Sequence, residues 1–202
     1  MAATTPPLLE EIEPAILAVP ARRGRLTCLV DGDGVSWMDE RVRFDEITSV
    51  AYATSSGRLN LVQARVERRI RLVTASGELQ LDLGVRSFGT KFEDEHSAIY
   101  STVVAAVHAR VEPRLRSEAL RAIAAGRTVR IGKLRLTRDD ISIRGRKRLE
   151  WRQLPEAQLE RRKVIVRGTL EQNTSVLCTL DMLTPGAVLL PELLAEATLP
   201  FA

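Results

Sequence analysis

Two stretches of the chain decide the fold: 35-VSWMDERVRFDEI-47 and 141-ISIRGRKRLEWRQL-154. Both follow an acidic turn, and in both apolar residues alternate with polar ones around a charged hairpin tip. This period of two is typical of antiparallel strands with one buried face. With one inserted residue the stretches align at a separation of 106 to 107 positions, pairing Val35 with Ile141, Ser36 with Ser142, Trp37 with Ile143, Val42 with Leu149, Phe44 with Trp151 and Ile47 with Leu154.

The repeat predicts two structurally similar domains, because a solenoid would need shorter and more numerous units. The length of 202 residues is enough for two small domains. With 45% hydrophobic and 28% charged residues, the composition is that of a globular protein and argues against a disordered or fibrous chain. Aromatic residues are only 4% of the chain, which argues against the stacking platforms that bind single-stranded nucleic acid.

Each copy is expected to hold a set of antiparallel strands. In the first copy the apolar alternation predicts strands near 25–30, 35–38, 41–44, 47–54, 61–75 and 78–84. In the second copy it predicts strands near 128–131, 133–137, 141–144, 148–153, 158–167 and 176–181. Gly77 is expected in a tight turn between the last two strands of the first copy.

One helix is expected to follow each set of strands. From about residue 94 to 125, apolar residues recur every fourth position, as in an amphipathic helix laid on a sheet: Ile99, Val103, Val107, Val111 and Leu115. Pro113 is expected to kink or restart this helix, and Gly126 is expected to end it. A final helix is expected from about 185 to 197, with Pro185 in its first turn.

Three features of the chain resemble bacterial proteins with tandem pleckstrin-homology-like (PH-like) domains: the signatures RVRFDEI and RLEWRQL, the glycine-bounded helix between the halves, and the segment GRTVRIGKLRL that reopens the sheet. The resemblance covers residues 20–197 and includes no catalytic signature. It implies an α+β fold, mainly β, with two PH-like antiparallel β-barrels or sandwiches in tandem, each closed by a C-terminal helix. The corresponding divisions are an N-terminal segment at 1–20, a first domain at 21–125 and a second domain at 126–202.

The two copies differ directly after their aromatic residue. The first copy has the acidic pair Asp45 and Glu46, where the second has Arg152 and Gln153. If the acidic pair serves a partner, only the first copy can use it.

Several features favour a cytoplasmic protein. The N-terminus carries three glutamates and lacks a basic region before its apolar residues, unlike a secretory signal. No uncharged apolar run approaches the roughly 20 residues that a membrane span requires. Cys28 and Cys178 lie in separate apolar runs and are expected to be buried thiols, with a disulfide as the less favoured alternative.

The motifs that could carry catalysis or bind a metal are weak. The string from Asp31 to Gly34 begins like a calcium loop, but Ser36 and Val42 stand where glycine and glutamate are required, which favours a hairpin turn. His96 and His108, twelve residues apart, would lie about 120° apart on one helix and could not easily share a metal. No nucleophile elbow and no glycine-rich phosphate loop occurs. We therefore expect no enzymatic activity, no cofactor and no metal.

The net charge of +4 is unevenly distributed along the chain. Residues 126–167 contain fourteen basic and five acidic side chains, a net charge of +9, whereas residues 168–202 contain four acidic and no basic side chains. Guanidinium groups bind phosphates through paired hydrogen bonds. Seven cations at two predicted hairpin tips therefore form a candidate anionic-ligand patch, if the tips converge: Arg144, Arg146, Lys147, Arg148, Arg161, Arg162 and Lys163. The alternative is that these basic residues lie on the solvated outer faces of strands and bind no ligand.

The sequence favours a non-enzymatic protein-interaction module, a scaffold or adaptor, because small sheets can accept a peptide strand at an open edge. The N-terminal LLEEIEPAILAV could be such a strand, on its own domain or on another chain, and the second arrangement would give a homodimer. The alternative function is a peripheral membrane adaptor whose basic second domain binds anionic lipid headgroups. Nucleic acid is the least expected partner, because no helix-turn-helix pattern and no RNA-binding aromatic motif occurs.

Overall fold

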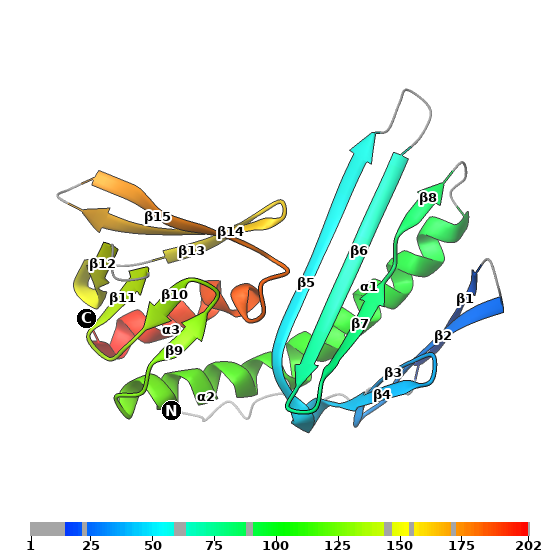
Figure 1. Ribbon diagram of the computed structural model, residues 1–202, viewed down its shortest axis with the longest axis horizontal. Coiled ribbons are helices and arrows are strands. Elements are labelled where there is room, and N and C mark those ends of the chain that lie inside the picture. Colours follow the sequence, from blue (N-terminus) through cyan, green and yellow to red (C-terminus); the bar gives the residue numbers. More distant parts are fainter. Residues whose placement is uncertain are drawn as a thin grey trace, which may run out of the picture.

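The computed structural model describes residues 15–21, 24–58, 64–87, 91–143, 147–153, 156–170 and 173–201. Over these residues the fold is mixed α+β and mainly β, with four small antiparallel sheets and three α-helices (Figure 1). Both halves follow the same order of elements: a four-stranded meander, a short 3-10 turn, a three-stranded meander and a helix.

The first half contains two sheets and the long helix. Its first sheet has the order β1 (Ala15–Ala21), β2 (Gly24–Val30), β3 (Gly34–Trp37) and β4 (Glu40–Arg43). Its second sheet follows the 3-10 turn η1 (Phe44–Glu46) and contains β5 (Ile47–Arg58), β6 (Ala64–Thr74) and β7 (Glu78–Asp82), with β8 (Val85–Ser87) also on β6. The helix α1 (Lys91–Arg110) completes this half.

The second half repeats this order after α2 (Glu112–Ala124). Its first sheet consists of β9 (Val129–Ile131), β10 (Leu134–Leu136), β11 (Asp140–Ile143) and β12 (Lys147–Glu150). Its second sheet follows η2 (Trp151–Gln153) and consists of β13 (Glu156–Glu160), β14 (Lys163–Leu170) and β15 (Asn173–Asp181). The chain then forms η3 (Ala187–Leu189) and α3 (Leu190–Phe201).

The sequence repeat is a structural repeat. Val35 pairs with Val42 across β3 and β4, and at the equivalent place Ile141 pairs with Leu149 across β11 and β12. Phe44 and Trp151 each begin a 3-10 turn, and both side chains are buried in the core. The alignment is therefore confirmed for Val35 with Ile141, Val42 with Leu149 and Phe44 with Trp151, while Leu154, the predicted partner of Ile47, lies outside the described residues.

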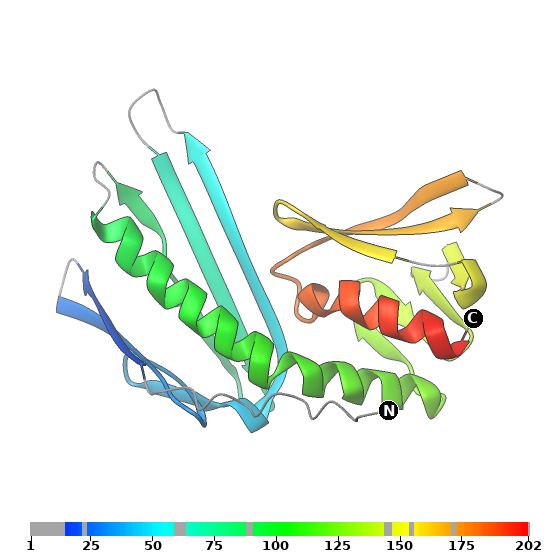
Figure 2. The same cartoon turned by 180° about the vertical axis from the view of Figure 1, so that it is seen from behind.

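The expectation of closed barrels is wrong. Within the described residues no sheet closes on itself, because η1 and η2 separate the fourth strand of each half from the fifth. Figure 2 shows α1 lying between the two sheets of the first half, where it contacts β1 and β2 on one side and β6 and β8 on the other. A helix in that position holds the sheets apart and fills the space between them with its apolar stripe.

The predicted amphipathic stripe is confirmed. Its five residues are all buried: Ile99, Val103, Val107, Val111 and Leu115. The helix breaks once along its length. The break falls between Arg110 and Glu112, where Pro113 occupies the first turn of α2. The helix ends at Gly126 with φ 75°, where the Gly126 and Arg127 amides donate to the carbonyls of Ile123 and Ala122. This arrangement is the Schellman motif, and it requires the left-handed backbone that glycine adopts readily.

Strand β1 begins at Ala15 and pairs along β2, so AILAV pairs within its own half, while LLEEIEP lies outside the described residues. Three element boundaries differ from the prediction. The strand expected at 148–153 ends at Glu150, because 151–153 form η2. The strand expected at 158–167 is a hairpin, β13 and β14, which turns at Arg161 with φ 53°. The final helix begins at Leu190, because Gly186 with φ 80° starts a 3-10 turn after Pro185.

Helix α2 joins the two halves. Arg114 donates hydrogen bonds to the carbonyl oxygens of Phe44 (3.1 Å) and Ile47 (2.6 Å) in the first half. On the other side Arg116 forms ion pairs with Glu192 and Glu196 of α3. The halves also touch directly, since the Gly186 amide donates to the Val50 carbonyl of β5 at 2.8 Å.

Both cysteine thiols are expected to resist labelling in the folded protein. Cys28 is fully buried in the first half and Cys178 is 5% exposed in the second, and both are free thiols. Burial raises the pKa of the Cys28 thiol to about 11 and also raises that of Cys178, so neither forms much reactive thiolate. Ellman's reagent at about pH 8 should label neither residue until urea unfolds the chain.

Each thiol reports on one half, so the single variants Cys28→Ser and Cys178→Ser assign any labelling to its half. Rapid labelling of the wild-type chain without denaturant would show that the corresponding core is open.

Candidate interaction site

The candidate anionic-ligand patch is only partly within the described residues. Arg144 and Arg146 lie outside them, and of Lys147 only the backbone is described, as the first residue of β12. The other four members lie on two separate elements: Arg148 in β12, and Arg161, Arg162 and Lys163 where β13 turns into β14. Figure 1 places this turn at the end of its sheet nearest β5, and places β12 at the far end of the second half.

Arg148 stabilises its own sheet through an ion pair with Asp140, whose side chain is largely buried. The first half has a similar ion pair, in which Nη2 of Arg41 contacts both carboxylate oxygens of Asp31 at 2.8 and 3.0 Å, although Asp31 stands at another position of the repeat than Asp140. Arg41 and Arg148 occupy equivalent positions, because they pair with Ser36 and Ser142 in their sheets. This arginine belongs to the structural repeat.

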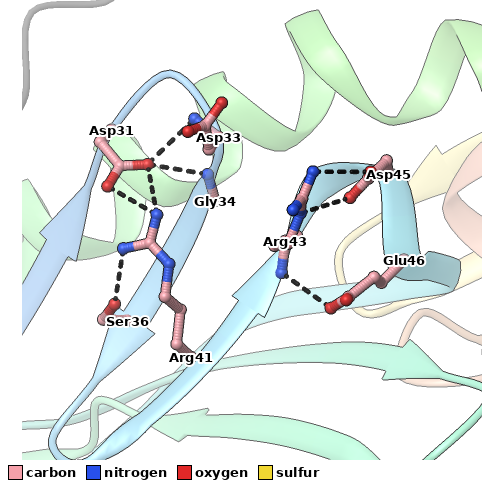
Figure 3. Close-up of polar contacts among 8 residues, drawn as sticks. All are labelled: Asp31, Asp33, Gly34, Ser36, Arg41, Arg43, Asp45 and Glu46. Carbon is pink, nitrogen blue, oxygen red and sulfur yellow. Dashed lines mark hydrogen bonds and ion pairs between the residues drawn. The ribbon is translucent and has the colours of Figure 1, made fainter.

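The acidic string after β2 forms the predicted hairpin turn (Figure 3). One carboxylate oxygen of Asp31 accepts hydrogen bonds from the amides of Asp33 (3.0 Å) and Gly34 (2.9 Å). Burial alone would raise the pKa of Asp31, but hydrogen bonds from Arg41 and from these amides outweigh burial and lower it. Thr137 has the same role in the second half, where its hydroxyl accepts hydrogen bonds from the amides of Asp139 and Asp140. The Asp31 carboxylate therefore serves the turn.

Asp45 and Glu46 are also engaged within the chain. Asp45 forms a bidentate ion pair with Arg43, and Glu46 accepts the Arg43 amide at 3.3 Å (Figure 3). At the equivalent place Gln153 accepts the Glu150 amide at 2.8 Å. The change from Glu46 to Gln153 therefore preserves a hydrogen bond that holds the 3-10 turn.

Most of the sheet edges are poor templates for an added strand. Strands β4 and β12 have four residues each and are mostly charged, and β9 has only three residues. Strand β7 carries Glu78 and Asp82, which form ion pairs with Arg71 and Arg69 of β6. Strand β1 contains Pro20, which has no amide donor. Short, charged or proline-containing edges are the usual protection against unwanted strand pairing.

Strand β5 is the longest edge strand and is uncharged up to its last residue, and the shorter edge strand β15 (nine residues) is likewise uncharged up to Asp181. Strand β5 is the outer strand of its sheet, and its residues from Ile47 to Gly57 include no charged residue and no proline. The Val50 carbonyl accepts a hydrogen bond from the Gly186 amide, which lies outside the sheet. This carbonyl therefore points away from β6. Backbone groups of alternate residues point the same way in a strand, so those of Tyr52, Thr54 and Ser56 also face outward.

A polar network around the buried side chain of Glu112 supports β5 from the helix side. The Tyr52 hydroxyl donates to Oε1 of Glu112 at 2.8 Å, while Oε2 of Glu112 contacts Nδ1 of His108 at 2.9 Å. Glu112 is 3% exposed at the start of α2, where the helix dipole favours an anion. Burial and then the charge of Glu112 raise the pKa of the Tyr52 phenol, so it remains a hydrogen-bond donor. The network fixes β5 to the junction of α1 and α2.

The part of the chain that the structure describes contains no group of three His, Cys, Asp or Glu residues placed to hold a metal ion. Its helices are each too short or too polar to cross a membrane. Comparisons with protein-family models, curated proteins and solved structures found no match.

Strand β5 was not predicted as a site, because edge status depends on which strands pair. The uncharged run from Ile47 to Gly57 is visible in the sequence and is the signal that could have identified it.

Proposed function

We propose that the chain is a non-enzymatic protein-interaction module of two PH-like domains in tandem, which binds an extended peptide segment by strand addition to β5. The PH-like assignment is supported by the order of elements in both halves, seven or eight strands in two sheets followed by one helix. The observation that carries the binding proposal is the long, uncharged edge of β5, whose outward backbone groups begin beside Val50. Strand addition gives affinity through main-chain hydrogen bonds.

The proposal accounts for the length of the uncharged edge on β5. An edge with eleven consecutive uncharged residues is an aggregation risk that natural sheets usually avoid. Its retention is understandable if another segment pairs with it. The network of Tyr52, Glu112 and His108 would keep β5 straight and ready to pair, which lowers the entropic cost of binding.

The experiment selects binders for the full chain from a displayed library of random twelve-residue peptides and measures their affinity by calorimetry. Thr54→Pro should weaken binding by about tenfold or more, because it removes an outward amide donor without breaking a β5–β6 hydrogen bond. Thr54→Val is the matched control: it also loses the hydroxyl that bonds Tyr100, but it keeps the amide and should bind like the wild type. Ser56→Pro and Ser56→Ala form a second pair in case Thr54→Pro does not fold.

Amide hydrogen exchange locates the bound peptide. The amides of Tyr52, Thr54 and Ser56 should exchange quickly in the free protein and become protected in the complex. The proposal is overturned if no peptide is selected, if the selected peptides bind the proline variants as well as the wild type, or if protection appears on β15 and not on β5.

A further inference from the structure

One cross-strand row of the sheet β9–β12 is cationic. The register places Arg130 opposite Arg135, Arg135 opposite Ser142, and Ser142 opposite Arg148. These four residues share the outer face of the sheet, because the residues that flank them in the strands point into the core: Ile131, Leu134, Leu136, Ile141 and Leu149. All three arginines are exposed.

Arg130 and Arg135 have no structural role that the described residues reveal. Neither forms an ion pair or a side-chain hydrogen bond with another described residue, unlike Arg148, which pairs with Asp140. Like charges directly opposite on neighbouring strands destabilise a sheet. Two adjacent arginines at such a position therefore cost stability in the absence of a ligand.

The first half shows that the fold does not need this charge. Its equivalent row runs through Ile16, Leu29, Ser36 and Arg41. The serine and the last arginine are common to both rows, and that arginine holds an aspartate in each half. Arg130 and Arg135 thus stand where the first half has isoleucine and leucine, so the extra charge is a property of the second half alone.

The positive charge forms a narrow track. Neighbouring strands lie about 4.8 Å apart, so a row across four strands spans about 14 Å. The adjacent row on the same face carries Asp140 opposite Glu150, which bounds the track on one side with acidic residues. The turns that flank β10 add the exposed side chains of Lys133 and Arg138. A linear anion fits this arrangement better than a bilayer, which would also meet the acidic row.

We propose that the arginine row, defined as Arg130, Arg135 and Arg148, binds the phosphodiester backbone of double-stranded nucleic acid without reading its bases. An acidic polypeptide is a weaker candidate ligand, because a single exposed ion pair between an arginine and a carboxylate contributes little to binding. A phosphodiester polymer instead releases condensed counterions when cations meet its phosphates, and guanidinium groups match phosphate oxygens in pairs. The sequence argued against nucleic acid because it contains no helix-turn-helix pattern and no RNA-binding aromatic motif. Contact with the phosphodiester backbone alone requires neither of them.

The test measures fluorescence anisotropy of a labelled mixed-sequence DNA duplex, and of an RNA duplex, with the full chain at increasing salt. Arg148 pairs with Asp140 through Nε, which leaves its terminal nitrogens for a phosphate. Three phosphate contacts predict a loss of affinity of about 40-fold between 50 and 200 mM salt. The double variant Arg130→Gln/Arg135→Gln keeps one contact, so its affinity should fall only about fourfold over the same range, from a weaker starting value. The matched control is Arg161→Gln/Arg162→Gln, which removes the same charge from the β13–β14 turn and should behave like the wild type.

Three results would overturn the proposal. The first is no duplex binding at 50 mM salt, and the second is an equal loss in the control variant, which would indicate a response to net charge alone. The third is binding of phosphatidylserine-rich vesicles or polyglutamate through the arginine row at least as tight as that of the duplexes. Circular dichroism checks that both double variants are folded. None of these variants alters β5, so the outcome is independent of the peptide site.

Discussion

Trp151→Ala should destabilise the protein by about 3–5 kcal/mol, the usual cost of deleting a large aromatic side chain from a core. Trp151 is 2% exposed at the point where the first sheet of the second half leads into the second. Its ring nitrogen also donates to the Thr137 carbonyl at 3.1 Å, which would lose this partner. Urea unfolding followed by circular dichroism measures the loss.

Spectroscopy can show whether the two halves unfold together in this variant. Trp37, buried in the first half, becomes the only tryptophan, so its fluorescence reports on that half alone. We expect the Cys178 thiol to become reactive at a lower urea concentration than the one at which the fluorescence of Trp37 changes. Such a difference would show that the two halves unfold in separate transitions.

Trp151→Phe is the control for the Trp151→Ala prediction. It places in the second half the ring type that Phe44 supplies in the first, and it should cost less than the alanine variant. A loss below about 1 kcal/mol for Trp151→Ala would contradict the assignment of Trp151 to the core.

Arg114→Met should cost about 2–4 kcal/mol, because a hydrogen bond from a charged donor contributes about 1.5–3 kcal/mol and the two bonds that are lost share one nitrogen, so they contribute less than their sum. Arg114 donates to the carbonyls of Phe44 and Ile47, at the two ends of the turn that joins the first sheet to β5. Methionine keeps the apolar stem and removes both bonds. Thermal or urea unfolding of the variant measures the loss.

Two further variants separate the hydrogen bonds of Arg114 from its ion pair. Arg114 also pairs with Glu118 at 2.9 Å on the surface of α2, and Glu118→Gln should change stability by less than about 0.5 kcal/mol. Arg114→Lys keeps the charge with a single ammonium group and should lie between methionine and the wild type. If Glu118→Gln costs as much as Arg114→Met, the contacts to the turn are not what stabilises the junction.

The local parts of the fold were predictable. The amphipathic stripe of α1 and α2, the break at Pro113 and the end at Gly126 all depend on residues within a few positions of one another. The hairpin between β13 and β14 was not, because its turn contains Arg161 and Arg162 instead of glycine, asparagine or proline. Pairing between the strands compels Arg161 into a left-handed backbone that its own propensity disfavours.

The candidate sites divide in the same way. The basic block of residues 126–167 was visible in the sequence, but the residues chosen from it were those adjacent along the chain. The arginine row joins Arg130, Arg135 and Arg148, which come from three strands and become neighbours only through the sheet register. Register depends on long-range pairing, which spacing along one strand does not contain.

By itself the sequence determined that the chain is a duplication of a mainly β unit with one helix per copy, because the period of two, the fourfold helical spacing and the repeat are local patterns. Only the tertiary structure decided that the sheets stay open around their helices and that β5 is an unpaired edge. The physical reason is that closure and edge status are set by which distant strands exchange hydrogen bonds, and by where the apolar stripe of each helix is buried.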